Sequence, residues 1–203
     1  MTPSELFDAD KAKKRKAPSA TWLFFQRWLA NPLAMGSVTP SSPALRRIIA
    51  ANLTCGPDEI VVEFGGGTGA ITKALLESGI PPNRIYVIEI DGELATYLRR
   101  SFPGVQVIHG DCRQVEELIG ADRVGKVGTV VCGIPTVTLP METQRAIIEA
   151  SFKVMPKGRR FLLYTYSLTS PLPVNVLGLN AKRVGWTAAN IPPASVFAYT
   201  KAE

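Results

Sequence analysis

A glycine-rich turn sits where an apolar strand meets an amphipathic helix, about a third of the way along this chain. The strand is expected at residues 60–64, Gly65-Gly66-Gly67-Thr68-Gly69 follows, and the helix continues through Leu75 and Leu76. Glycine has no side chain, so the backbone can turn sharply there and approach a ligand closely. The pattern predicts a βα unit with a nucleotide-type cofactor on its loop; a tight glycine turn without a ligand is the alternative.

Alternation of strands and helices continues through the rest of the chain. Such repeats predict a parallel sheet with helices on both faces. Two final strand candidates follow one another without a helix, which predicts an antiparallel edge hairpin. The fold class is therefore α/β, a Rossmann-like, mostly parallel sheet with an antiparallel C-terminal edge. The further strands are expected near residues 84–90, 105–109, 127–132, 161–166, 183–188 and 195–200, and the further helices near 94–100 and 143–154.

An N-terminal helical extension, residues 1–56, is expected to precede the core of residues 57–203. In its second half, Ser42 is a good N-cap and Pro43 suits the first helical position. The helix that follows has an apolar stripe, and Gly56 is expected to stop it. The stripe consists of Leu45, Ile48, Ile49 and Leu53.

Positive charge is concentrated in the N-terminal part of the chain. Residues 1–50 hold eight Lys/Arg and three Asp/Glu, whereas the rest is nearly balanced. A basic run at residues 11–16 precedes a helix expected between Pro18 and Asn31, with aromatic residues on one face. This composition is typical of a helix lying on an anionic membrane. Packing of the apolar face on the core, or a solvated basic tail, remain the alternatives.

Cysteine and histidine content argues against a metal centre. The three cysteines, Cys55, Cys112 and Cys132, lack metal-type spacing, and His109 is the single histidine. We expect no metal ligand set, and a reduced, cytoplasmic protein. No apolar run is long enough for a membrane-spanning helix.

Two carboxylates follow the next two strands. Glu89 ends the second strand, and Asp111 follows the third in His109-Gly110-Asp111-Cys112. The carboxyl ends of parallel strands lie at one edge of a sheet, where α/β proteins bind ligands. Glu89 can accept hydrogen bonds from ribose hydroxyls, and Asp111 from an adenine amino group; alternatively, both only cap helices.

Together these motifs resemble class I S-adenosylmethionine-dependent methyltransferases, especially the branch with rRNA adenine dimethylases and bacterial phospholipid N-methyltransferases. Further stretches are similar to bacterial phosphatidylethanolamine N-methyltransferases in particular. The similarity covers roughly residues 20–200. The first set of motifs is E-x-G-x-G-x-G at 63–69, I-E-x-D at 88–91 and G-D-C at 110–112; the second is FQRWLANP at 25–32, MGSVTPSS at 35–42, CGIP at 132–135 and NIPPA at 190–194.

The resemblance implies S-adenosyl-L-methionine as the cofactor and assigns its contacts. The glycine loop with Glu63 is expected to hold the methionine part, Glu89 the ribose, and Asp111 with Cys112 the adenine. The complete set of implied cofactor residues is Ser37, Glu63, Gly65, Gly67, Thr68, Gly69, Glu89, Ile90, Asp111, Cys112, Gly133 and Pro135.

The fourth strand ends in Gly133-Ile134-Pro135-Thr136, beside the expected position of the methyl group. We call this the acceptor side of the site, because the methyl acceptor would bind there. Base-amine methylases usually carry an Asn, Asp or Ser here to accept from the amine, and an aromatic residue to stack on the base. Gly133 and Thr136 occupy those positions, which disfavours adenine. A small lipid amine needs no stacking platform, and backbone carbonyls of Gly133 and Ile134 could orient it. Tyr164, at the end of the fifth strand, is the side-chain candidate, unless it is an ordinary strand aromatic.

The resemblance thus implies N-methylation of phosphatidylethanolamine, in successive steps to phosphatidylcholine. The expected partners are the phospholipid and an anionic membrane surface met by the N-terminal helix, at the inner face of the cell membrane. No nucleic acid and no protein partner are expected. The alternatives are an RNA adenine N6-dimethyltransferase, or a non-catalytic membrane- or RNA-binding module; a nicotinamide dehydrogenase fits the glycine loop alone.

Overall fold

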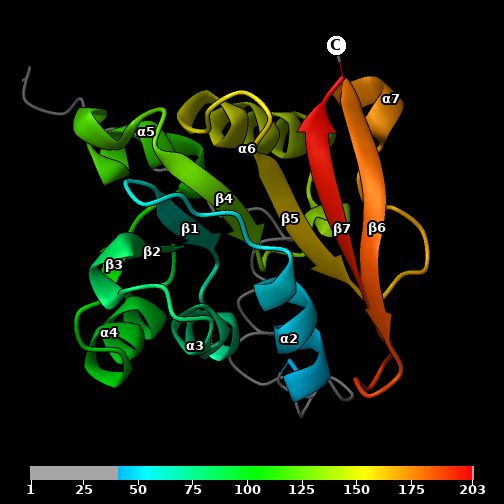
Figure 1. Cartoon of the computed structure of the whole chain (residues 1–203). Helices are drawn as coiled ribbons and strands as arrows, with labels where there is room; N and C mark the ends of the chain where they lie inside the picture. Colours follow the sequence, from blue (N-terminus) through cyan, green and yellow to red (C-terminus); the bar gives the residue numbers. More distant parts are fainter. Residues whose placement is uncertain (1–40, 203) are drawn as a thin grey trace, which may run out of the picture.

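Residues 41–202 of the chain are described by a computed structural model, and they form one seven-stranded sheet (Figure 1). The strand order is β3-β2-β1-β4-β5-β7-β6. Strands β1 to β5 run parallel, while β7 pairs antiparallel with β5 and β6 antiparallel with β7. The expected α/β sheet with an antiparallel C-terminal edge is confirmed. The strands are β1 Ile60–Phe64, β2 Ile85–Glu89, β3 Gln106–His109, β4 Val127–Cys132, β5 Arg160–Thr165, β6 Leu179–Thr187 and β7 Ala194–Lys201.

Helices cover both faces of the sheet. Residues that alternate along a strand point to opposite faces, so Val61 packs with α2, α3 and α4, and Val62 packs with α5 and α6. Two apolar clusters result, one on each face. Within residues 41–202, no helix has the length and apolarity that crossing a bilayer requires. The helices are α2 Pro43–Ala51, α3 Ala70–Glu77, α4 Gly92–Ser101, α5 Val115–Ile119, α6 Met141–Val154 and α7 Val174–Leu177, with 3₁₀ turns at Pro82–Arg84, Cys112–Gln114, Ala121–Arg123 and Thr136–Thr138.

Helix α2 begins as the sequence predicts and ends earlier. The Ser42 hydroxyl accepts a hydrogen bond from the Leu45 N–H at 3.2 Å, and Pro43 is the first helical residue. The helix stops at Ala51 because the side chain of Asn52 turns back and donates to the Ile48 carbonyl at 2.8 Å. Gly56 is therefore not the residue that ends this helix, and the buried apolar residues of α2, Leu45 and Ile49, pack on the sheet.

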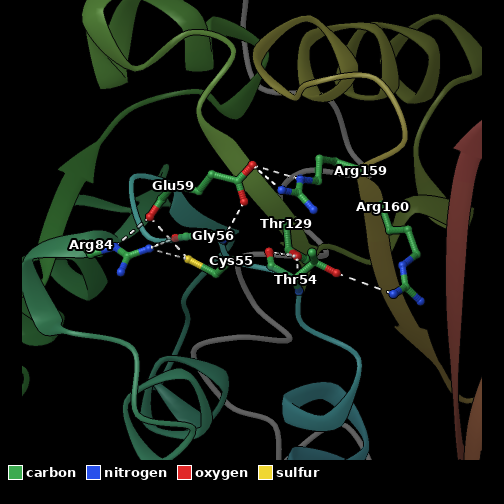
Figure 2. Close-up of polar contacts among 8 residues, drawn as sticks. All are labelled: Thr54, Cys55, Gly56, Glu59, Arg84, Thr129, Arg159 and Arg160. Carbon is green, nitrogen blue, oxygen red and sulfur yellow. Dashed lines mark hydrogen bonds and ion pairs between the residues drawn. The ribbon is translucent and has the colours of Figure 1, made fainter.

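A polar network closes the amino edge of the sheet, opposite the glycine turn (Figure 2). Glu59 accepts hydrogen bonds from Arg159 Nε at 2.9 Å and Nη2 at 2.6 Å, and from the Gly56 N–H at 2.6 Å. Arg84 donates to the backbone carbonyls of Glu59 and Gly56. The Thr129 hydroxyl exchanges hydrogen bonds with the Thr54 backbone. These contacts fasten the α2–β1 connection to β4 and to the start of β5.

We expect Glu59→Gln to lower the free energy of unfolding by about 1–3 kcal/mol, because the neutral amide leaves a half-buried Arg159 without the anion to which its Nε and Nη2 both donate. Glu77→Gln is the matched control, since Glu77 forms an exposed pair with Lys73 at 3.8 Å and such pairs contribute at most about 1 kcal/mol. Urea unfolding measures both. Equal effects of the two substitutions would contradict the structural role of the network.

Candidate functional site

The glycine turn occupies the carboxyl edge of the sheet, between β1 and α3. Gly65, Gly67 and Gly69 have φ values of 75°, 53° and 82°, a region that other residues rarely adopt. A side chain at Gly66 would lie 2.5 Å from Val87 Cγ1 and 2.8 Å from Leu98 Cδ1. Glycines are therefore required for two different reasons, backbone conformation and the close packing of the turn against β2 and α4. Thr68 is exposed at the top of the turn.

Glu89 is completely buried and fixes this turn from the neighbouring strand. Its Oε2 accepts a hydrogen bond from the Gly67 N–H at 2.9 Å, and its Oε1 accepts from the Asp91 N–H at 3.0 Å. Capping of α4 is done by Asp91 instead, which accepts from Glu93 and Leu94. Glu89 is therefore not a helix cap, and each carboxylate oxygen keeps a lone pair for further donors such as hydroxyls. Ile90 follows it and is 38% exposed.

Glu63, at the end of β1, is also buried and lies close to Glu89. The Thr72 hydroxyl donates to its Oε2 at 2.7 Å. Burial raises the pKa of Glu63 to about 8; the negative charge of Glu89 acts in the same direction, while the Thr72 hydrogen bonds oppose both. At neutral pH without a bound cation, Glu63 is mostly protonated. A cationic ligand nearby would favour its ionised form.

Asp111 is held by its neighbour Arg113. Its carboxylate accepts from the Arg113 backbone N–H at 2.9 Å, capping a 3₁₀ turn, and from the Arg113 guanidinium. Burial tends to raise the pKa of Asp111, but hydrogen bonds and the charge of Arg113 outweigh it and lower the pKa. An adenine amino group would share this carboxylate with the guanidinium. The sequence did not single out Arg113, although it stands two residues after Asp111. Cys112 is buried beside it.

The His109 side chain completes the edge between β2 and β3. Its Nε2 lies 3.0 Å from the Ile90 carbonyl oxygen. The imidazole therefore joins the ends of two strands.

Gly133 stands where β4 meets the glycine turn. A Cβ on Gly133 would lie 2.8 Å from the Gly65 carbonyl oxygen and 3.3 Å from the Tyr164 hydroxyl. The Gly133 N–H donates to the Phe64 carbonyl at 2.8 Å, and Ile134 Cγ1 packs over Gly65. The structure thus brings Gly133, Ile134 and Tyr164, the three predicted acceptor residues, to the mouth of the glycine turn. Pro135 follows in the same loop.

Tyr164 is surrounded by site residues. Burial, the Tyr166 hydroxyl and the Glu63 carboxylate raise the pKa of Tyr164, while Ser41 acts in the opposite direction. The phenol is therefore neutral and can donate or accept a hydrogen bond. Ser41 directly precedes α2, so this helix begins beside the acceptor side.

Asn190 begins the NIPPA stretch, which the sequence left without a structural role. It is 1% exposed, its Oδ1 accepts from the Ser42 N–H at 2.9 Å, and its Nδ2 donates to the Pro192 carbonyl at 3.0 Å. The β6–β7 turn is therefore fastened to the start of α2. Its partner is 148 residues away in sequence, which is why sequence reasoning could not find the contact.

The cysteines are unsuited to covalent catalysis, because burial raises the pKa of all three thiols, that of Cys132 to about 12. Among residues 41–202, no three His, Cys, Asp or Glu side chains gather as metal ligands would. Ser37, the basic run at residues 11–16 and the segment between Pro18 and Asn31 that is predicted to be helical lie outside the described residues.

We expect stability at rising pH to report on Glu63. The unfolded chain loses this proton near its ordinary pKa of 4.5 and the folded chain near 8, so the contribution of the protonated group is present below pH 4.5 and lost toward pH 8. Wild-type stability should fall, relative to Glu63→Gln, by up to about 1.4 kcal/mol per pH unit over that window. Urea unfolding of both proteins from pH 5 to 8.5 measures it. Parallel pH profiles would contradict a buried, protonated Glu63.

We expect Gly133→Ala to weaken binding of S-adenosylhomocysteine at least about tenfold, because the new methyl group displaces the backbone of Gly65. Gly92→Ala is the matched control, since its Cβ would meet only His109, at an ordinary 3.4 Å. Calorimetric titration measures both affinities. Unchanged binding to Gly133→Ala would show that the turn tolerates the displacement.

Comparison with protein-family models gives no match. The ornithine lipid N-methyltransferase of Singulisphaera acidiphila is 32% identical over 141 residues, which cover 68% of this chain and 73% of that protein. Ribosomal RNA small subunit methyltransferase A of Chlorobium chlorochromatii is 37% identical over 86 residues, 42% of this chain. The chain spans only about a third of the length of that relative, 31%.

Solved structures agree on the fold. Magnesium protoporphyrin IX methyltransferase from Synechocystis PCC 6803 with bound S-adenosylmethionine has a TM-score of 0.58 at 15% identity, covering 92% of this chain and 99% of that one. The glycopeptide N-methyltransferase MtfA complexed with the same cofactor has a TM-score of 0.57 at 15% identity, covering 78% and 93%. These neighbours support S-adenosyl-L-methionine as the cofactor. The chain is a class I methyltransferase and belongs to the family that includes the ornithine lipid N-methyltransferase of Singulisphaera acidiphila.

Proposed function

We propose that the protein transfers a methyl group from S-adenosyl-L-methionine to the amine nitrogen of a membrane lipid, with phosphatidylethanolamine as the substrate. Two features of the site where the methyl acceptor would bind support this proposal. The Tyr164 hydroxyl lies beside Gly133, and Thr136 occupies the position at which base methylases have an aromatic residue. A lipid amine needs a hydrogen-bond acceptor and no stacking residue, which is what these positions offer.

The residues of the glycine turn suit this cofactor. The turn offers space without side chains, Glu89 has lone pairs for two ribose hydroxyls, and Glu63 can compensate the positive charge of the methionine part. Asp111 and Cys112 supply the adenine contacts, together with Ile90 and Pro135. When bound, the cofactor supplies an electrophilic methyl group on a sulfonium.

The chain then has to orient a neutral amine. A free ammonium has a pKa near 10, and the apolar surroundings of Tyr164 favour loss of its proton. The Tyr164 hydroxyl can accept the remaining N–H, and the Gly133 carbonyl can accept a second one. The Ile134 carbonyl is a poorer candidate, because it already accepts from the Thr136 N–H at 2.8 Å. In-line alignment of nitrogen and methyl group supplies much of the catalysis.

Two lipid amines compete as the substrate. The motifs resemble phosphatidylethanolamine N-methyltransferases, whereas the relative with 73% coverage acts on ornithine lipid. Successive transfers to mono-, di- and trimethyl products, ending at phosphatidylcholine, follow from the resemblance. RNA is the second candidate, favoured by the rRNA methyltransferase relatives, and disfavoured by the missing stacking residue.

Attachment to the inner face of the cell membrane is part of the proposal. The basic run and aromatic helix of residues 11–32 would hold the protein peripherally on anionic lipid, from the cytoplasmic side. Residues 1–56 thereby act as an extension that guides lipid to the core of residues 57–203, with α2 beginning beside Tyr164.

Labelled S-adenosylmethionine, offered with vesicles of phosphatidylethanolamine, vesicles with ornithine lipid, or rRNA, tests the proposal. We expect label in the phosphatidylethanolamine products. Label only in ornithine lipid would correct the substrate, and label only in RNA would overturn the lipid assignment. A chain lacking residues 1–30 should lose activity on vesicles and keep cofactor binding.

We expect Tyr164→Phe to lower kcat about 10- to 100-fold, as loss of one positioned hydrogen bond does at an acceptor. Binding of S-adenosylhomocysteine should stay within about twofold, because the hydroxyl faces the acceptor. Tyr97→Phe, on the exposed face of α4, is the control. Equal kcat for Tyr164→Phe and wild type would remove Tyr164 from the reaction.

A further inference from the structure

Large apolar side chains are exposed at one end of the described structure. Eight large apolar side chains are exposed in residues 41–202. Six of them lie near the carboxyl edge of the sheet or at the neighbouring end of the β6–β7 hairpin. Leu168 is 66% exposed, Ile191 67% and Trp186 48%. We call these three residues, with Lys182 and Arg183, the hairpin rim.

The register of the strands brings the rim together. Trp186 pairs with Ser195 of β7, and Ser195 pairs with Thr165, the last residue of β5. Leu168 lies in the segment that leaves β5 after Thr165, and Arg183 Nη1 lies 3.5 Å from the Leu168 carbonyl oxygen. Ile191 is at the tip of the turn between β6 and β7. Figure 1 shows this turn at the lower end of the sheet and α7 at the opposite end.

Charge around the rim has one sign. The segment 166–195 contains no Asp or Glu, and its two cations, Lys182 and Arg183, are exposed on β6. Leu, Ile and Trp beside Arg and Lys form the combination that settles at a bilayer surface, with apolar groups below the headgroups and cations against anionic ones. Exposed apolar side chains that gather at one end of a structure, rather than singly, mark interaction surfaces.

We infer that the hairpin rim is a second membrane-contact surface, which docks on anionic lipid bilayers independently of the N-terminal helix. The role of this surface rests on the proposed function, because docking by the hairpin rim would turn Tyr164 and Gly133 toward the lipid headgroups. Asn190 fastens the rim to the start of α2 through Ser42, so the rim and the acceptor side keep a fixed relative position.

Two double substitutions test the rim in the full chain. Leu168→Ser with Ile191→Ser should lower partitioning onto phosphatidylethanolamine/phosphatidylglycerol vesicles about tenfold, from the apolar area withdrawn from lipid. Lys182→Gln with Arg183→Gln should lower it about fivefold per cation, and only on vesicles containing phosphatidylglycerol. Val176→Ser is the matched control, because Val176 is 54% exposed on α7, at the opposite end of the sheet. Unfolding midpoints near that of wild type show that the variants fold.

Unchanged partitioning of Leu168→Ser/Ile191→Ser would overturn the rim. The rim would equally be overturned if this variant lowered the sedimentation mass without vesicles, since the surface would then join two copies of the chain. A direct readout uses Trp22→Phe/Trp28→Phe, which leaves Trp186 as the single tryptophan. Brominated lipids should quench its fluorescence, and no quenching in the bound protein would also overturn the rim.

Activity separates this inference from the proposed function. If wild type methylates lipid in detergent and the rim variants partition normally, the rim fails and the function stands. If wild type methylates no lipid while the rim variants lose partitioning, the function fails and the rim stands. Binding of S-adenosylhomocysteine should be the same in all rim variants.

Discussion

The buried carboxylate of Glu89 holds the glycine turn in the shape on which the site depends. A buried carboxylate needs hydrogen-bond donors, and Glu89 finds them in the backbone of Gly67 and Asp91. One oxygen thus fixes the loop after β1, and the other fixes the loop after β2. The two hydrogen bonds that stabilise the buried Glu89 carboxylate therefore also set the distance between these two loops.

Glu63 adds a second acidic group a short distance away, and burial makes it costly for both to carry charge. Glu89 has two backbone donors, so the proton is expected on Glu63, whose pKa is raised to about 8. A cationic ligand would change this balance, because it stabilises both carboxylates at once. Two buried carboxylates beside the turn would therefore favour a cationic ligand over the anionic pyrophosphate that dinucleotide sites bind at a helix N-terminus.

Sequence patterns predicted those parts of the fold that depend on local signals. β1 and β4 have their expected bounds because both strands are buried on two faces and continuously apolar. The short helices α5 and α7 were missed, since four or five residues carry no measurable period. Site residues were found where glycine or carboxylate follows a strand. Three contacts were not predicted, because they depend on side-chain packing or on distant chain segments. They are Arg113 with Asp111, Thr72 with Glu63, and Asn190 with Ser42.

The two edges of the sheet have different requirements, which explains how polar and apolar residues are distributed between them. At the amino edge, the Glu59 carboxylate pairs with Arg159, and Arg84 donates to the Glu59 backbone carbonyl, so these polar groups have partners within the chain. At the carboxyl edge lie the glycine turn and the buried carboxylates of the candidate site, and Leu168, Trp186 and Ile191 are exposed at the same end. Exposed apolar area costs free energy in water and is regained on contact with lipid. In the proposed function this area lies where a lipid substrate would enter, which is the end of the sheet that carries the glycine turn.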